Sequence, residues 1–394
     1  MYLCKMKNIV IALILLMSFT GVSVQASIIV GAARTDVYVP LLKGKKVGLL
    51  SNHTGMVGDR HTLDIMLAEG IEVVTIFSPE HGFRGTADAG EKVGNSCDLA
   101  TGLPIVSMYS AGKKGIDPEV LKPLDVVVVD MQDVGTRFYT YYITMIKLME
   151  EVAPYGVEVM IFDRPNPLGM TVDGPVLDMT LRSGVGRLPI PVLHGMTLGE
   201  LAKMAVGEKW LKDGAQVKLT VVPCLNYTHE SRYTLTVAPS PNLRTMKAIY
   251  LYPSLCYFEG TPVSVGRGTE SPFMVFGHPS MKYTGFYFVP KSVEGAKNPP
   301  LLGRKCHGVD LTSVDDEAVI KAGVDLRYVI TAYKSCRLSG TKFFTSFFDK
   351  LMGNTKVRRM ILQGKSAADI KASWRDEVEQ FKKLREPYLI YPLQ

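Results

Sequence analysis

Between residues 46 and 163 the chain alternates short runs of Val, Ile and Leu with helix-like segments, and this feature constrains the fold most. The runs lack the apolar and polar alternation of half-exposed strands, so we expect strands that are buried on both faces. Such strands form parallel sheets covered by helices on both sides. We therefore predict an α/β fold with a Rossmann-like, doubly wound, mostly parallel sheet. The predicted strands are 46–52, 71–77, 104–109, 125–131 and 157–163, and the predicted helices are 60–70 and 137–152.

The chain has 394 residues, which exceeds what one hydrophobic core usually holds, so we expect two domains. The Rossmann-like domain is predicted to span 27–225, and a second, smaller α+β domain is predicted to span 226–394. Within the second domain, 250–277 is rich in aromatic residues, Gly and Pro and is expected to form a wall of a binding cleft. Strand-like and aromatic segments alternate over 311–353, whereas 366–389 has the pattern of one amphipathic helix.

The first 26 residues have the features of a signal peptide. Lys5 and Lys7 precede the apolar run NIVIALILLMSF, and small residues lead up to Ala26. We expect cleavage after Ala26 and export to the periplasm or the medium. The apolar run is shorter than the about 20 residues that cross a bilayer, and no later stretch is long enough. No stable membrane insertion is therefore expected after cleavage.

Charge and cysteine content narrow the classes of partner. The formal net charge is +7, and it falls to +5 without the signal peptide, which holds two lysines and no acidic residue. This mild basic excess suits an anionic partner, but no basic run interleaved with aromatics suggests nucleic acid. Five widely spaced cysteines remain, without a disulfide framework or a CxxC metal motif, so most are expected to be buried thiols.

Polar and ionisable residues stand at the carboxyl ends of four predicted strands. In open α/β sheets this edge forms the ligand crevice. No GxGxxG motif follows the first strand, so a dinucleotide cofactor is not expected. The residues are Asn52 and His53 after the first strand, Glu80 and His81 after the second, Asp130 and Asp133 after the fourth, and Asp163 and Arg164 after the fifth.

Each of these residues also has a purely structural interpretation. Glu80 lies in FSPEHGFRG, whose Pro and Gly are typical of a surface turn. Asp133 suits the N-cap of the next helix, and Asp163 suits the turn before Arg164. Tyr139 can pack in a core, although it lies near the crevice end of its helix. Polar residues follow four predicted strands at one edge of the sheet. It is less probable that all four do so by coincidence than that they form a site.

Six motifs occur in a fixed order along the chain: SPEHGFRG, VVVDMQDVGTRFYTY, FDRPNP, LHGMTLGELA, SPNLRT and YFEGTPVSVGRGTESPF. In this order they resemble one family of enzymes, the exo-acting β-N-acetylmuramidases of glycoside hydrolase family 171. The resemblance covers roughly Val30 to the C-terminus. It implies removal of N-acetylmuramic acid from the non-reducing ends of peptidoglycan fragments during cell-wall turnover. It also implies a Rossmann-like catalytic domain and an auxiliary domain that closes the substrate cleft.

The resemblance places the family's catalytic glutamate at Glu80, the Glu of SPEHG. Glycoside hydrolysis usually needs a second carboxylate, about 5–5.5 Å away for retention of configuration or roughly 6.5–9.5 Å away for inversion. Asp130 is the first candidate for this group and Asp133 the second. Either can act as a nucleophile, as a base, or as a brace for the substrate's own acetamido group.

N-acetylmuramic acid carries a lactyl carboxylate, and a guanidinium that binds both oxygens is its preferred partner. The arginine candidates are Arg84, Arg137, Arg164 and Arg267. The other residues predicted to bind substrate are Asn52, His81, Tyr139, Asp163, Asn166 and Glu270.

Two other functions fit parts of the same pattern. A metal-dependent exported hydrolase would use Asp130, Asp133, Asp163 and His81, although no HxH or HExxH spacing supports it. A non-catalytic periplasmic protein that binds peptidoglycan or sugars would use the same crevice. The sequence predicts the glycosidase, with neither a metal nor a cofactor.

Overall fold

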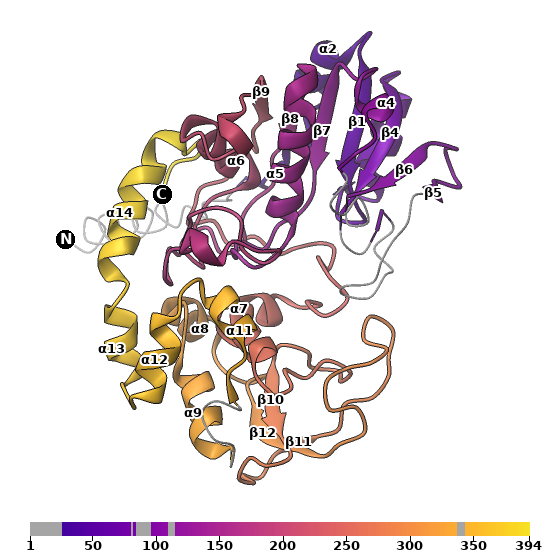
Figure 1. The fold of residues 1–394 in the computed structure, drawn as a ribbon. Coiled ribbons are helices and arrows are strands. Elements are labelled where there is room, and N and C mark those ends of the chain that lie inside the picture. The colour runs from indigo at the N-terminus through magenta and orange to yellow at the C-terminus, as the bar shows by residue number, and fades with distance from the viewer. Residues whose placement is uncertain (1–25, 80–81, 84–95, 109–114, 337–342) are drawn as a thin grey trace, which may run out of the picture.

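The computed structural model describes residues 26–79, 82–83, 96–108, 115–336 and 343–394. It has a sheet part, coloured indigo to magenta in Figure 1, and a C-terminal part coloured orange to yellow. The two parts lie side by side, and one hydrophobic cluster includes buried residues of both. Within the described ranges, no helix is both long and apolar enough to cross a membrane.

The sheet part contains a seven-stranded sheet in the order β5-β6-β4-β1-β7-β8-β9. The chain moves outward from β1 to β6, returns to β7 beside β1, and moves outward again to β9. Neighbouring strands are parallel, except that the edge strand β5 is antiparallel to β6. This confirms the predicted doubly wound sheet, with its topological switch between β1 and β7. The strands are β1 (Lys46–Ser51), β4 (Glu72–Ser78), β5 (Ser96–Cys97), β6 (Pro104–Ser107), β7 (Val126–Asp130), β8 (Glu158–Phe162) and β9 (Leu219–Val222).

Both faces of the sheet are buried, which explains the near-continuous apolar runs. In β7, Val126 and Val128 point into one hydrophobic cluster and Val127 and Val129 into another. The first cluster includes side chains of α2 and α3, and the second includes those of α5 and α6. The helices of this part are α2 (Thr35–Leu42), α3 (Thr62–Ala68), α4 (Pro118–Leu121), α5 (Tyr141–Val152) and α6 (Leu198–Gly207), with short 3₁₀ turns η1 (Gly31–Ala33), η2 (Ala153–Tyr155), η3 (Met179–Leu181) and η4 (Lys212–Gly214).

Two predicted helices begin later than the sequence pattern suggests. The helix expected from residue 60 begins at Thr62, because 60–61 form β3 (Arg60–His61), which pairs with β2 (Met56–Val57) in a small hairpin. The helix expected from residue 137 is α5, which begins at Tyr141. The residues before it are irregular, and Thr136 forms an isolated β-bridge with Leu193.

The C-terminal part combines a small antiparallel sheet, in the order β10-β12-β11, with several short helices. This confirms the predicted smaller α+β part. Its strands are β10 (Val275–His278), β11 (Tyr287–Phe288) and β12 (Cys306–Asp310). Its helices are α7 (Met246–Leu255), η5 (Cys256–Gly260), α8 (Asp316–Ala322), α9 (Arg327–Ser335), α11 (Ser346–Met352), α12 (Lys356–Leu362), α13 (Ala367–Ala372), α14 (Arg375–Arg385) and η6 (Glu386–Tyr388).

Two expectations for this part were wrong. Beyond β12, the described residues of 311–353 contain the helices α8, α9 and α11 rather than strands, and aromatic residues such as Phe343 and Phe348 pack into the core. The single helix expected over 366–389 is divided between α13 and α14. Trp374 lies at the break, where it is buried and its indole N–H donates to Asp173 at 2.9 Å.

The end of the chain returns to the sheet part, as Figure 1 shows for α14 beside α6. Beyond α14, the Tyr391 hydroxyl donates to Asp163 at 2.7 Å, and the Ile390 N–H donates to Glu200 at 2.8 Å. These bonds join the two parts of the chain. Of the five described cysteines, Cys97 is exposed, the other four are buried, and none is in a disulfide.

Candidate active site

The polar residues predicted at strand ends surround the topological switch of the sheet. Strands β1 and β7 pair in register as far as Ser51 and Asp130. The Ser51 hydroxyl also donates to the Asp130 carbonyl oxygen at 2.7 Å, which ties the two ends together. Asn52 and Asp133 follow these adjacent ends, where open α/β sheets bind their ligands.

Asp130 is fully buried, and both of its carboxylate oxygens are occupied. Arg164 donates from Nε to Oδ1 at 2.6 Å and from Nη2 to Oδ2 at 2.9 Å, and the Thr62 hydroxyl donates to Oδ2 at 2.5 Å. Arg164 further donates to the carbonyl oxygen of Met56 at 3.1 Å. A carboxylate engaged in this way has little freedom to attack a sugar. The contacts therefore favour a structural role for Asp130 and Arg164.

Asp133 differs from Asp130 because one of its carboxylate oxygens is free. Oδ2 accepts from the Gly135 N–H at 2.7 Å, whereas Oδ1 is buried without a hydrogen-bond partner in the described part of the chain. Burial raises the pKa of Asp133 to about 7, although hydrogen bonds from backbone amides, first that of Gly135, lower it. A carboxyl group with this pKa can hold and donate a proton near neutral pH.

The turn that presents Asp133 requires glycine at position 135. Gly135 has a φ of 80°, and a Cβ there would lie 2.0 Å from Asn166 Oδ1. Asn166 is itself fixed, because its Nδ2 donates to the Met196 carbonyl oxygen at 2.9 Å and its Oδ1 accepts from the Leu168 N–H at 2.8 Å. Asn166, which was predicted to bind substrate, therefore packs against Gly135 in this turn.

Two further buried polar groups near the switch have no hydrogen-bond partner in the described ranges. Asn52 Oδ1 accepts from the backbone N–H and hydroxyl of Thr54 at 3.0 and 2.6 Å, but Asn52 Nδ2 has no partner among the described residues. The same holds for the hydroxyl of Ser78, the last residue of β4, which precedes Glu80 by two positions. Buried polar groups are normally satisfied. Unpaired groups on Asn52, Ser78 and Asp133, at the ends of three neighbouring strands, therefore favour a ligand site.

Asp163, which directly follows β8, is engaged by the start of α6 and by the end of the chain. Its carboxylate accepts from the Thr197 hydroxyl at 2.7 Å, the Gly199 N–H at 2.9 Å and the Tyr391 hydroxyl at 2.7 Å. Burial raises the pKa of Asp163 to about 6. These contacts give Asp163 a structural role, anchoring the start of α6 and the end of the chain.

Arg137 and Tyr139 also have structural partners. The Arg137 guanidinium is fully buried and donates to the carbonyl oxygens of Pro175, Ile190 and Leu351 at 2.6, 2.8 and 3.0 Å. Since Leu351 belongs to α11, these bonds connect the two parts of the chain, and they favour a structural role over binding a lactyl group. The Tyr139 hydroxyl donates to the Pro239 carbonyl oxygen at 2.7 Å, and its ring faces a cavity.

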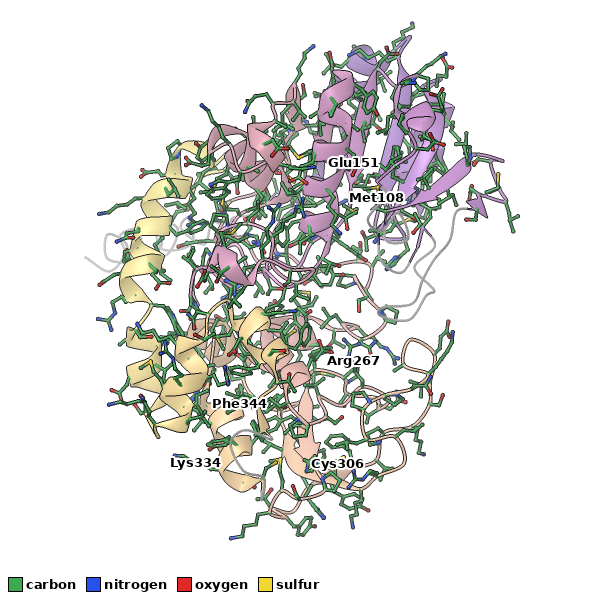
Figure 2. All side chains as sticks on the ribbon, in the orientation of Figure 1. Met108, Glu151, Arg267, Cys306, Lys334 and Phe344 are labelled. Atoms are coloured by element: carbon green, nitrogen blue, oxygen red, sulfur yellow. The ribbon has the colours of Figure 1, made fainter. Side chains whose placement is uncertain are left out.

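A cavity of about 550 Å³ lies between the two parts. One wall comes from Met108 and from α5 with the residues before it, and the opposite wall comes from the C-terminal part. Figure 2 shows Met108 and Arg267 on the two sides. The predicted aromatic wall over 250–277 does contribute here. The aromatic residues that line the cavity are Phe138, Tyr139, Tyr141, Tyr252, Phe258, Phe273 and Phe347.

Arg267 lines this cavity but already has a partner. Its guanidinium forms an ion pair with Glu259 at 2.8 Å and lies 5.0 Å from the centre of the Phe273 ring. Glu270, predicted beside it, is exposed and does not line the cavity. Sequence reasoning missed Lys147, which lines the cavity from α5. The signal for it was the helical spacing of Thr140, Thr144 and Lys147.

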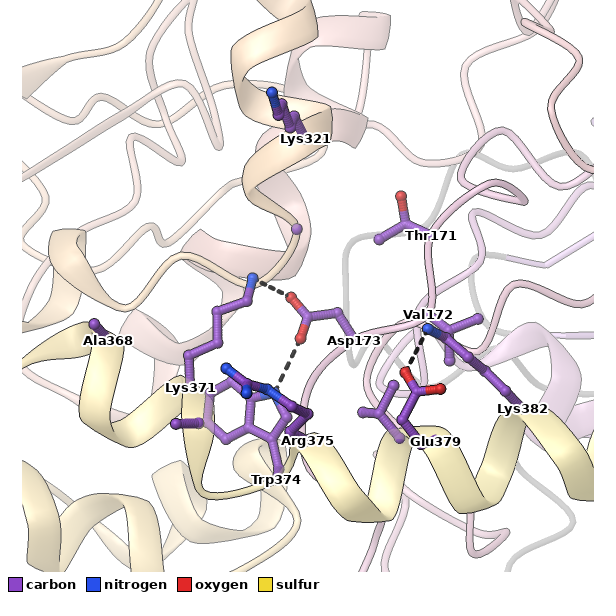
Figure 3. A pocket seen from close by; sticks show the side chains of 13 residues that line it. Thr171, Val172, Asp173, Lys321, Ala368, Lys371, Trp374, Arg375, Glu379 and Lys382 are labelled. Atoms are coloured by element: carbon purple, nitrogen blue, oxygen red, sulfur yellow. Dashed lines mark hydrogen bonds and ion pairs between the residues drawn. The ribbon is translucent and has the colours of Figure 1, made fainter.

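A second cavity, of about 450 Å³, lies away from the strand ends, against α13 and α14 (Figure 3). Its central acid is Asp173, which accepts from Lys371 at 2.6 Å and from the indole N–H of Trp374 at 2.9 Å. Asp173 also accepts from the Val324 N–H at 2.9 Å. Because this carboxylate is fully engaged in holding α13 and α14, the cavity is a weaker candidate for catalysis.

Three predicted site residues, Glu80, His81 and Arg84, lie outside the described residues. Among the residues that are described, no group of three or more His, Cys, Asp and Glu side chains is placed to hold a metal ion. Two of the ligands considered for a metal-dependent hydrolase, Asp130 and Asp163, are already engaged by the hydrogen bonds given above.

Comparison with known proteins covers both parts of the chain. Two family models match, the N-terminal model of the exo-β-N-acetylmuramidase NamZ over residues 47–247 and its C-terminal model over 250–391. The chain is 38% identical over 375 residues to the peptidoglycan β-N-acetylmuramidase NamZ of Bacillus subtilis (strain 168), covering 90% of this chain and 89% of that protein.

Two crystal structures of DUF1343 family proteins from Bacteroides fragilis NCTC 9343 have the same fold. One, at 1.30 Å resolution, is 52% identical with a TM-score of 0.88, over 94% of this chain and all of that chain. The other, at 1.65 Å, is 28% identical with a TM-score of 0.78, over 92% of this chain and 99% of that chain. With both domain models matched in order, the chain belongs to the exo-β-N-acetylmuramidase NamZ family.

Proposed function

We propose that the chain is an exo-acting β-N-acetylmuramidase that releases N-acetylmuramic acid from the non-reducing ends of peptidoglycan fragments. The observation that carries this proposal is the 38% identity to the peptidoglycan β-N-acetylmuramidase of Bacillus subtilis over 90% of the chain. The cavity between the two parts supports it, because a volume of about 550 Å³ with aromatic walls suits a sugar ring.

Glu80 is the proposed catalytic carboxylate. The support is its place in the sequence motif SPEHG, two residues after the last residue of β4. Strand β4 is a neighbour of β1 and ends at the same edge of the sheet as β1 and β7. Because β4 ends at the edge where open α/β sheets bind their ligands, the sequence position of Glu80 suits a catalytic carboxyl group.

Asp133 is the proposed second carboxyl group. Its Oδ1 has no hydrogen-bond partner among the described residues, whereas both oxygens of Asp130 accept from Arg164 and Thr62. Burial keeps Asp133 substantially protonated near neutral pH, so the role that fits it best is to donate a proton or a hydrogen bond to the substrate. Asn52 Nδ2, which also lacks a partner in the described structure, can donate to a carbonyl or hydroxyl oxygen of the same sugar.

Export completes the proposal. Peptidoglycan lies outside the cytoplasm, and residues 1–26 have the composition of a cleaved signal peptide. We therefore place the enzyme in the periplasm or the medium, with a mature chain that begins after Ala26.

The test is to incubate the purified mature chain with glycan fragments that carry N-acetylmuramic acid at the non-reducing end, and to identify products by mass spectrometry. The wild type should release free N-acetylmuramic acid. Glu80→Gln and Asp133→Asn should each lower turnover by at least ~10²-fold, the usual contribution of a positioned acid or base. Glu72→Gln is the matched control, because Glu72 is exposed at the opposite end of β4. Release of no muramic acid by a folded wild type would refute the function.

A further inference from the structure

We propose that Lys147 binds the lactyl carboxylate of N-acetylmuramic acid and thereby sets the preference for this sugar over N-acetylglucosamine. The inference rests on the proposed function and assigns its selectivity to a lysine of α5 rather than to an arginine.

The position of Lys147 on α5 directs it into the cavity between the two parts. Residues three and four apart lie on the same face of a helix. Thr140, just before α5, and Ile143, Thr144 and Lys147 within it follow this spacing, and all four line the cavity. The stripe places a hydroxyl and an ammonium group side by side on one wall. The ammonium group is a suitable partner for a carboxylate, whereas the Thr144 hydroxyl already donates its proton to the Thr140 carbonyl oxygen at 3.1 Å.

The cavity lining, as far as it is described, holds one more cation than anions. Of its described lining residues, Lys147 and Arg267 are cationic and Glu259 is anionic, so the net charge is +1. Arg267 and Glu259 neutralise each other through their 2.8 Å ion pair. Among the described lining residues, Lys147 is therefore the cation without a counter-charge in the lining; Glu150, which is on the same helix but does not line the cavity, raises the pKa of the Lys147 ammonium. N-acetylmuramic acid differs from N-acetylglucosamine by one negative charge, which matches this excess.

The carboxylates nearest to Lys147 along α5 are already engaged. Glu150 forms ion pairs with Arg187 and, at 3.6 Å, with Arg182, and it accepts from the Lys212 N–H at 3.0 Å. Glu151 accepts from the Ile116 N–H at 3.2 Å. Within the described ranges, no carboxylate forms an ion pair with Lys147.

The surroundings of Lys147 favour an incoming anion. Partial burial, and then the positive charge of Arg187, lower the pKa of the Lys147 ammonium. Lys147 is nevertheless exposed, so an incoming carboxylate can reach its ammonium group. The described arginine candidates lack this freedom, because Arg137 binds three carbonyl oxygens, Arg164 binds Asp130, and Arg267 binds Glu259.

The experiment compares specificity constants for a chromogenic β-N-acetylmuramic acid glycoside and its N-acetylglucosamine counterpart. In Lys147→Met, the ratio of the muramic to the N-acetylglucosamine specificity constant should fall by about 10-fold or more. This is the effect expected from the loss of one charge-assisted hydrogen bond. The change should come mainly from a higher KM for the muramic substrate. Lys147→Arg keeps the charge and should keep most of the preference. Lys334→Met is the matched control, since Lys334 is an exposed helical lysine that does not line the cavity.

A second comparison separates Lys147 from the ion pair on the opposite wall. The double variant Glu259→Gln, Arg267→Met removes one charge of each sign and leaves the cavity at +1, so its ratio should stay near that of the wild type. The assignment would be overturned if Lys147→Met kept the wild-type preference for the muramic glycoside. It would also be overturned if only the double variant lost this preference. Failure of the wild type to hydrolyse either glycoside would instead refute the proposed function.

Discussion

Arg164 holds the carboxylate of Asp130 by two hydrogen bonds, of 2.6 and 2.9 Å, and both side chains are buried. The pair joins the end of β7 to the segment that follows β8. Asp130→Asn should therefore destabilise the fold by about 3–5 kcal/mol, because it leaves a buried guanidinium without its counter-charge. Urea unfolding measures this loss.

The control for this prediction removes both charges. Asp130→Asn combined with Arg164→Met should be less destabilised than the sum of the two single variants, since no unpaired charge stays buried. If Asp130→Asn instead unfolds like the wild type but has lost all turnover, Asp130 is a catalytic group and the structural interpretation is wrong.

The raised pKa of Asp133 predicts a pH dependence of stability. The folded-state pKa is about 7 and the ordinary value is 3.8, so between these values the folded state binds more protons than the unfolded state. Stability must then fall as the pH rises through this range, by roughly 4 kcal/mol at most at about 1.4 kcal/mol per pKa unit. Asp163, with a pKa raised to about 6, contributes with the same sign.

Asp133→Asn should remove its share of this dependence. The free energy of unfolding, measured in urea at about pH 5 and about pH 8, should differ less between the two conditions in the variant than in the wild type. Asp163→Asn offers a parallel comparison away from the cleft. Equal pH dependence of Asp133→Asn and the wild type would show that the Asp133 carboxyl is not held protonated by burial.

Replacement of Arg137 should lower the stability of the fold without changing the selectivity for substrate. Arg137→Met should cost at least about 3 kcal/mol, because three buried carbonyl oxygens lose a charged donor. The ratio of muramic to N-acetylglucosamine hydrolysis should stay unchanged in the protein that folds. Arg375→Met is the control, since Arg375 is exposed and its replacement should change stability by less than about 0.5 kcal/mol. If Arg137→Met instead lowers the ratio of muramic to N-acetylglucosamine hydrolysis, Arg137 contributes to substrate binding.

Much of the sheet could be predicted because strands that are buried on two faces have near-continuous apolar sequences. The run 125–131 corresponds to β7, and the run 157–163 corresponds to β8. The helices within 311–353 were missed because each is short and its aromatic residues serve tertiary packing, as Phe348 does in α11. Local pattern alone cannot separate a short buried helix from a strand.

The site was harder to predict than the sheet because the roles of its residues depend on partners that are distant in sequence. Asp130 and Asp133 are three residues apart, and the sequence favoured Asp130 because it stands at the end of its predicted strand. The difference comes from Arg164, 34 residues from Asp130, which binds Asp130, while Asp133 Oδ1 has no partner in the part of the chain that the structure describes. Lys147 stands out for the same kind of reason, because its neighbour Glu150 is taken by Arg187.

The most direct measurement of the central claim is turnover of a chromogenic β-N-acetylmuramic acid glycoside by the purified mature chain, beside the N-acetylglucosamine counterpart under the same conditions. We predict hydrolysis of the muramic substrate with at least about 10-fold preference, the worth of one charge-assisted contact to the lactyl group. Glu80→Gln should be folded and at least ~10²-fold slower. A folded wild type that leaves the muramic glycoside intact, or that prefers the N-acetylglucosamine glycoside, would contradict this account.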